Sequence, residues 1–426
     1  MHEELSLHMY FVELLKTLGE VGVSDVYVSP ISPVKVRYLG QVMPLSKALG
    51  EMAKSVDPVI IQGLNAIPSK LNLREGFGSY EFSLRILSYV ANQIALLPNY
   101  ADLYLKPLIQ NGAVDIGMAL NEGYRVRVHG FVNGGYLREG LDTVFGGTED
   151  EEATRRKLSQ AFSYVTLVMR IIPPPEPRLE GLGLAPTVGN EILSTKGLYL
   201  ITGPTASGKT TTLSSLLLRA AMTKPWHIIS LEDPIEYHLY LDPAKYPGLV
   251  HQRERGRDFP DFKHALFQAL RESPDLIAVG EVRDRETLEW VLYLAEAGFL
   301  VLATYHTSTF RETVHRIVHS FEGGEREVTK ARLMGTLKGV LSQRLIPTSK
   351  GLRLAYEFHS LRDGGAQKIE VALNGGTPST ELSWSKSLRA LVAQGELSEA
   401  EALNYEAMLS GSGPTSGYLP PSGGRR

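Results

Sequence analysis

Residues 203–210 read GPTASGKT and follow directly on the apolar run 198–201. This is the pattern of a phosphate-binding loop set between a strand and a helix. Glycines let such a loop curl around an anion, so that successive N–H groups point at phosphate oxygens. The helix expected over 211–221 aims its positive end at the same charge. A glycine-rich turn without a ligand is the alternative, which the strand-loop-helix context disfavours, so the loop predicts nucleotide binding.

Each position of the loop has an expected part in holding ATP and Mg²⁺. We expect Lys209 to reach the β- and γ-phosphates, and the Thr210 hydroxyl to bind Mg²⁺. The predicted nucleotide-binding set is Gly203, Pro204, Thr205, Ala206, Ser207, Gly208, Lys209, Thr210 and Thr211.

Length and composition limit the class of protein. The 426 residues predict two or three domains, and the net charge of −3 gives no basic field, so nucleic-acid binding is not indicated. The absence of cysteine excludes disulfides and thiolate metal sites. The N-terminal segment is acidic and amphipathic, unlike a signal peptide, and no apolar run approaches the roughly 20 residues of a membrane span. We expect a soluble, intracellular protein without a direct membrane span, and any membrane association would come through partners.

Residues 1–172 mix helical and strand patterns, which predicts an α+β domain with an antiparallel sheet. Helical spacing over 9–19 is followed by strand-like alternation at 26–28, 34–38, 80–84, 124–128 and 164–168. The proline-rich run 173–177 and the glycines after it propagate neither helix nor central strand, so we expect a linker over 173–188.

Residues 189–408 alternate between strands and helices, which predicts an α/β domain with a mainly parallel sheet. The expected strands are the buried runs 198–202, 227–231, 276–279 and 300–304. A helical hairpin is expected over 388–407. Gly395 is expected to end its first helix, and a capping box over 398–401 to begin its second. The tail 409–426 is rich in glycine, serine and proline and is predicted to be disordered.

Charged side chains follow the expected strands at the sheet edge where ligands bind. Glu236 lies in the acidic run 232–236, and Glu281 follows a strand directly after Gly280. A carboxylate beside a phosphate loop can hold Mg²⁺ or orient the water that attacks the γ-phosphate, and we assign both roles to Glu281 and Glu236. Glu232 and Asp233 either share this work or cap the turn.

Three histidines near the fourth strand divide into two predictions. His306 follows the strand 300–304 at the same sheet edge, so we interpret it as a γ-phosphate sensor, with a hydrogen-bonded structural histidine as the alternative. His315 and His319 have helical spacing but lack the glutamate of a zinc motif. We interpret that pair as ordinary helix surface.

Four ordered segments together resemble the secretion ATPase superfamily: the Walker A loop GPTASGKT, the Asp box ISLEDPIEY (229–237), the Walker B segment LIAVGEVRD (276–284) and the His box ATYHTST (303–309). The resemblance implies a PAS-like N-terminal domain, a RecA-like P-loop ATPase domain, a homohexamer, and Thr210, Glu236 and Glu281 around Mg²⁺. It also implies that arginines close the nucleotide site, namely Arg283 of the Walker B segment and Arg125, Arg127 and Arg170 of the N-terminal domain. Arg125 and Arg127 are two apart and so share one strand face, although a solvated strand face is the alternative.

The chain departs from the family at Ala206, which stands where the family has glycine. A methyl group there requires φ below zero or else adds strain. This and other differences are most similar to the DotB-type ATPase of Dot/Icm and related conjugative systems. The expected function is therefore a hexameric ATPase that powers a type IV secretion or conjugative transfer apparatus at the inner membrane. A type IV pilus retraction motor and a non-hydrolysing nucleotide-binding assembly subunit remain the alternatives.

Overall fold

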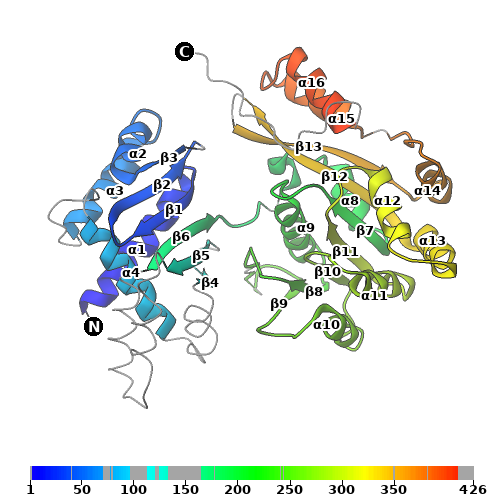
Figure 1. Ribbon diagram of the computed structural model, residues 1–426, viewed down its shortest axis with the longest axis horizontal. Helices are drawn as coiled ribbons and strands as arrows, with labels where there is room; N and C mark the ends of the chain where they lie inside the picture. The colour runs from blue at the N-terminus through cyan, green and yellow to red at the C-terminus, as the bar shows by residue number, and fades with distance from the viewer. Residues whose placement is uncertain are drawn as a thin grey trace. The chain divides into compact units, whose positions relative to one another are not determined.

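The computed structural model describes residues 2–39, 41–70, 77, 80–95, 113–119, 124–132, 165–176, 178–239, 241–242, 244–348, 351–380 and 382–410. The chain forms two compact units (Figure 1). The first contains Met1–Pro174 and Glu236–His238, and the second contains Pro175–Ile235 and Leu239–Arg426. From residue 411 on, the predicted disordered tail lies outside the described residues.

The first unit is a six-stranded antiparallel sheet in the order β3-β2-β1-β6-β5-β4. Its strands are β1 (Val23–Ser29), β2 (Ser32–Tyr38), β3 (Gln41–Pro44), β4 (Ala113–Ala119), β5 (Arg125–Val132) and β6 (Val165–Ile172). The helices α1 (His2–Glu20), α2 (Leu45–Met52), α3 (Pro58–Lys70) and α4 (Tyr80–Ala95) complete the apolar core with the sheet. This is the expected α+β architecture.

The predicted strand over 80–84 is wrong, because these residues begin helix α4. The buried residues Phe82, Ile86, Leu87 and Val90 recur at the three- and four-residue spacing of a helix. Five alternating residues are too short a window to distinguish a strand from the start of an amphipathic helix.

The second unit is built on a seven-stranded sheet in the order β13-β12-β7-β11-β10-β8-β9. The strands are β7 (Gly197–Thr202), β8 (His227–Glu232), β9 (Leu249–Glu254), β10 (Leu276–Val279), β11 (Leu300–Tyr305), β12 (Leu337–Thr348) and β13 (Gly351–Ser360). All neighbours pair in parallel except β12 and β13, which form a long antiparallel hairpin. The four predicted strands are present and the sheet is mainly parallel as expected, whereas β9, β12 and β13 were not predicted.

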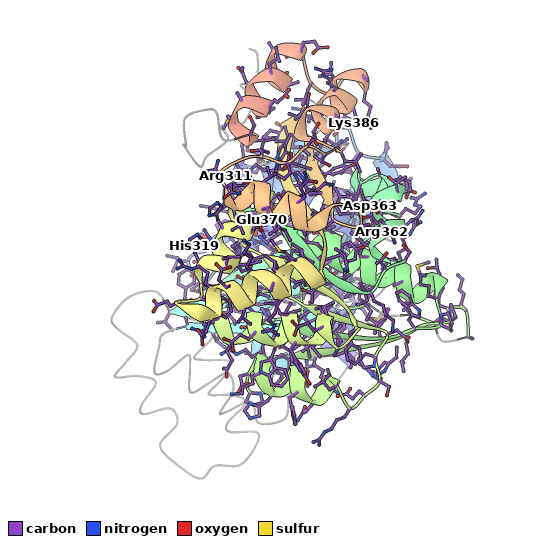
Figure 2. The ribbon with its side chains drawn as sticks, turned by 90° about the vertical axis from the view of Figure 1, so that its right-hand side faces the viewer. Arg311, His319, Arg362, Asp363, Glu370 and Lys386 are labelled. Atoms are coloured by element: carbon purple, nitrogen blue, oxygen red, sulfur yellow. The ribbon has the colours of Figure 1, made fainter. Side chains whose placement is uncertain are left out.

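Helices cover both faces of this sheet. The helices α10 (Phe262–Ala269), α11 (Arg285–Glu296), α12 (Phe310–His319), α13 (Gly324–Thr336) and α14 (Gly365–Leu373) share one apolar core with one sheet face. Figure 2 faces this side of the unit, with His319 of α12 and Glu370 of α14 labelled. Tyr199 points to the opposite face, where its hydroxyl donates to the Glu191 carbonyl oxygen of α8 (Pro186–Ile192) at 3.3 Å.

The helical hairpin near the C-terminus is confirmed as α15 (Trp384–Ala393) and α16 (Glu399–Leu409), and the predicted capping box of Ser398 and Glu401 is present. Within the predicted linker, the short 3₁₀ helix η4 (Leu179–Leu182) forms and α8 begins at Pro186. Among the described residues, no helix combines the length and the apolar character that a membrane crossing requires.

Candidate active site

The phosphate loop joins β7 to helix α9 (Lys209–Thr223) at the centre of the sheet. Gly203 and Gly208 take positive φ angles of 155° and 85°, which glycine adopts without strain. Gly208 is also the N-cap of α9 and supplies no side-chain cap. The N–H groups in the first turn of a helix lie at its positive end, which favours an anion. Pro204, Thr205 and Ala206 form the outer part of the loop, whereas Ser207 is buried.

Ala206 takes the strained alternative that the sequence left open. Its φ is +60°, in the left-handed region that favours glycine, and its side chain is exposed. The methyl group therefore has no buried contact that would offset the strain.

Lys209 is buried, and its ammonium group is held at the mouth of the loop. Nζ donates to the carbonyl oxygens of Gly203 and Pro204, both at 2.9 Å, and lies 3.4 Å from Nδ1 of His306. A lysine ammonium group only donates hydrogen bonds, so Nδ1 of His306 accepts and Nε2 carries the ring proton. The cation is therefore pre-positioned where the loop curls around an anion.

His306 connects this lysine to Glu281. Nε2 of His306 lies 2.7 Å from Oε1 of Glu281, and Oε2 of the same carboxylate pairs with Arg283 at 2.8 Å. The structure thus brings together four residues that the sequence placed at one sheet edge, namely Lys209, Glu281, Arg283 and His306. Both oxygens of the half-buried carboxylate are engaged.

Opposing effects set the pKa of Glu281. Burial by itself raises the pKa, but the hydrogen bond and charge of Arg283, with smaller effects of His306 and Lys209, outweigh it and hold the pKa below its usual value. The hydrogen bond to Glu281 in turn raises the pKa of Arg283. The carboxylate is therefore ionised near neutral pH, as a water-orienting base requires.

The acids of the Asp box have other partners. Glu232 is buried and accepts hydrogen bonds from Ser230 of β8 and Gln252 of β9 at 2.8 and 2.9 Å. Asp233 pairs with Arg255 at 3.2 Å and lies 3.6 Å from Arg283. Glu236 belongs to the first compact unit, whereas Glu232 and Asp233 belong to the second.

The three N-terminal arginines all lie in the first unit. Arg125 and Arg127 share one face of β5, as predicted, where Arg125 is buried and Arg127 is exposed. Arg127 pairs in register with Arg170 of β6, whose Nε donates to Asp25 at 3.1 Å.

His315 is half-buried and His319 is exposed on α12. Their rings stack at 5.4 Å on α12, and Nε2 of His315 contacts the Ala372 carbonyl oxygen at 3.0 Å. No cluster of metal-ligating side chains occurs within the part of the chain that the structure describes.

A cavity of about 580 Å³ opens beside the phosphate loop and was not foreseen from the sequence. It is lined by Gly208, Thr211 and Thr212 of the loop and α9 and by apolar residues that include Leu345 and Leu354. Glu180, Arg353 and Lys386 also line it, the last from α15. These residues are scattered over more than 200 positions, so no local motif marks them.

A family model described as "Type II/IV secretion system protein" matches residues 159–403, which is more than half of the chain. The chain belongs to this family. Membership in the secretion ATPase superfamily, which the four sequence motifs implied, also shows that the chain is a P-loop enzyme of the ATP-hydrolysing class.

Relatives of this secretion ATPase include an uncharacterised protein and a pilus retraction ATPase. It is 34% identical over 300 residues to the uncharacterised protein YggR of Escherichia coli K12, covering 68% of this chain and 82% of YggR. It is 37% identical over 244 residues to the type IV pilus retraction ATPase PilT of Pseudomonas aeruginosa PAO1, covering 55% and 70% of the two chains.

Solved structures confirm the fold of an N-terminal domain followed by a RecA-like ATPase domain. The crystal structure of the pilus retraction motor PilT with bound ADP matches with a TM-score of 0.63 and 29% identity, over 92% of this chain and 96% of that chain. The ATPase DotB of Legionella pneumophila matches with a TM-score of 0.64 over 94% and 95% of the chains, but at 22% identity it supports the fold alone.

Proposed function

We propose that this secretion ATPase binds ATP at residues 203–211 and hydrolyses it with Glu281. The observation that carries the proposal is the chain of contacts Lys209–His306–Glu281, which joins the phosphate loop to an ionised carboxylate. In this arrangement the Glu281 carboxylate orients and deprotonates the attacking water, and Lys209 compensates charge on the β- and γ-phosphates.

The proposed Mg²⁺ site fits the residues present. Thr210 stands in the first turn of α9, and the oxygens of Glu281 are hard ligands that suit Mg²⁺ directly or through water. When bound, the ion neutralises phosphate charge. Glu236 is proposed as an additional acid at this site, on the family resemblance.

His306 is proposed as the γ-phosphate sensor because it contacts both Lys209 and Glu281. A phosphate that draws Lys209 toward itself removes the donor to Nδ1 and frees the ring to reorient. Arg283 must likewise release one carboxylate oxygen before Glu281 can accept a proton from water. Arg125, Arg127 and Arg170 are proposed to close the site in the assembled homohexamer.

We infer that the cavity beside α9 receives the nucleoside part of ATP. A phosphate loop cradles the α- and β-phosphates with its backbone, and Gly208 and Thr211 beside this loop also line the cavity. The leucine side chains in the lining suit a planar base, and its charged side chains suit the polar edges of the base and the ribose hydroxyls.

Hydrolysis is proposed to power a machine of the type II/IV secretion and pilus class, docked at the cytoplasmic face of the inner membrane. A type IV secretion or conjugation apparatus was expected from the sequence. The solved PilT structure is 29% identical to this chain and the DotB structure is 22% identical, each over more than nine-tenths of the chain, which supports type IV pilus retraction more strongly. Expression of the chain in a twitching-deficient Pseudomonas strain that lacks PilT tests this partner class, because only a retraction motor restores twitching.

The enzymatic proposal is tested by phosphate release from the purified protein. We expect Glu281→Gln to keep MgATP binding and to lower turnover by at least about 100-fold, because only the transition state needs the base. Lys209→Ala is expected to lose nucleotide binding itself. Normal turnover by the Glu281→Gln variant would refute the assignment, and wild-type protein that binds ATP without turnover would favour the assembly-subunit alternative.

A further inference from the structure

Both the side chain and the backbone of Gln343, on β12, contact the phosphate loop. Its side chain is 1% exposed, and its Nε2 donates to the Ser207 carbonyl oxygen at 2.8 Å. The backbone carbonyl oxygen of Gln343 packs against Gly203, where an added Cβ would lie only 2.4 Å from that oxygen. An added Cβ at Gly208 would lie 3.3 Å from the same Nε2. One residue of a strand distant in sequence therefore touches the loop at three positions.

The hydrogen bond from Gln343 fixes the direction of one peptide group. In a trans peptide the carbonyl and the following N–H point in opposite directions. With the Ser207 carbonyl turned down onto Gln343, the N–H of Gly208 is turned away from β12, toward the concave side of the loop. Glycine tolerates both signs of φ, so Gly208 by itself leaves this peptide free to flip.

The side-chain amide of Gln343 does not stabilise the core around it. Its Oε1 is buried without a hydrogen-bond donor among the described residues, and the Ser207 hydroxyl is buried there without a partner as well. An unsatisfied buried acceptor destabilises a fold, so an unbranched apolar side chain of similar length would suit the core better. What the amide provides is the donor to the loop.

We propose that Gln343 is a positioning residue for nucleotide binding, which holds the Gly208 N–H group toward the phosphates. The inference rests on the proposed function of the loop. It predicts that the two properties of the protein separate when the amide is removed: nucleotide affinity falls, and the stability of the nucleotide-free protein does not.

The test compares Gln343→Met with wild-type protein by titration with MgADP and by urea unfolding without nucleotide. We expect the dissociation constant for ADP to rise about tenfold, whereas the urea midpoint stays the same or rises. Gln343→Glu keeps the length of the side chain but presents an acceptor to the Ser207 carbonyl oxygen, so its loss of affinity should be at least as large.

Ser342→Ala is the matched control on the adjacent position. Ser342 points to the other face of β12, where its hydroxyl accepts from Thr202 at 3.0 Å. Its loss should lower the urea midpoint and leave the ADP affinity unchanged.

Two results overturn the inference: ADP binding by Gln343→Met at wild-type affinity, or a urea midpoint that falls together with affinity, which assigns Gln343 to the core. Wild-type protein that does not bind ADP would instead overturn the proposed function, so the two failures are distinguishable.

Discussion

Ala206→Gly should stabilise the protein, although it removes a methyl group. A left-handed backbone costs a non-glycine residue about 1–2 kcal/mol. Glycine loses about 0.5–1 kcal/mol more than alanine through the entropy of the unfolded chain. Ala206 is exposed at φ +60°, so no packing is lost, and the difference leaves a net gain of about 0.5–1 kcal/mol.

Tryptophan fluorescence during urea unfolding measures this gain without interference from the first unit. All three tryptophans of the chain, Trp226, Trp290 and Trp384, lie in the second unit with the loop. With a urea dependence of about 3 kcal/mol per M, the midpoint should rise by roughly 0.2–0.3 M.

A second alanine provides a control with the opposite expected sign. Ala297 is exposed in the same unit but has a φ of −68°, in the ordinary helical region. Ala297→Gly should therefore lower the midpoint through the unfolded-state entropy alone. If Ala206→Gly also lowers the midpoint, the loop does not hold Ala206 in the left-handed region and the reasoning fails.

Three further predictions concern the site and the C-terminal hairpin. Arg283→Gln removes the guanidinium that lowers the pKa of Glu281, while burial still raises that pKa, so the carboxyl should protonate at a higher pH. The acid limb of the profile of kcat against pH should therefore shift to higher pH. An unshifted limb would contradict the pairing. His306→Asn should lower kcat by more than about tenfold with little change in ADP affinity, measured by phosphate release and titration. Ser398→Ala should lower stability by about 1 kcal/mol through loss of the capping box, with Glu399→Ala as a nearly neutral comparison in thermal unfolding.

Local motifs predicted the parts of the site that consecutive residues determine. The loop, the carboxylate after β10 and His306 after β11 each stand at the end of a buried apolar run, so the parallel sheet brings them to one edge. The strand β12 escaped prediction because Ser342, Gln343 and Arg344 interrupt its apolar pattern. Ser342 and Gln343 hydrogen-bond to Thr202 and Ser207, tertiary contacts that the one-dimensional pattern does not contain.

The same limit applies to partners across long sequence separations. Gln343 and Ser207 are 136 positions apart, and nothing in either segment identifies the other. The place of Glu281 directly after a strand predicts a carboxylate at the nucleotide site. Its contacts with Arg283 and His306 depend on side-chain directions, which the sequence pattern does not give. The helix α4 was misread because the alternation over 80–84 lasts for too few residues to define a period.

The strand order of the second unit has a consequence for how the protein is made. β7 is translated first among the strands of its sheet, yet its two neighbours, β11 and β12, emerge about 100 and 140 residues later. Until both neighbours have been made, the loop lacks either β11, which directly precedes His306, or β12, which contains Gln343, or both. A nascent chain that ends before residue 337 would contain the complete GPTASGKT motif but would lack β12, whose Gln343 donates to the loop. Competence for nucleotide is thus acquired late in synthesis, after slow non-local pairing of the central strands.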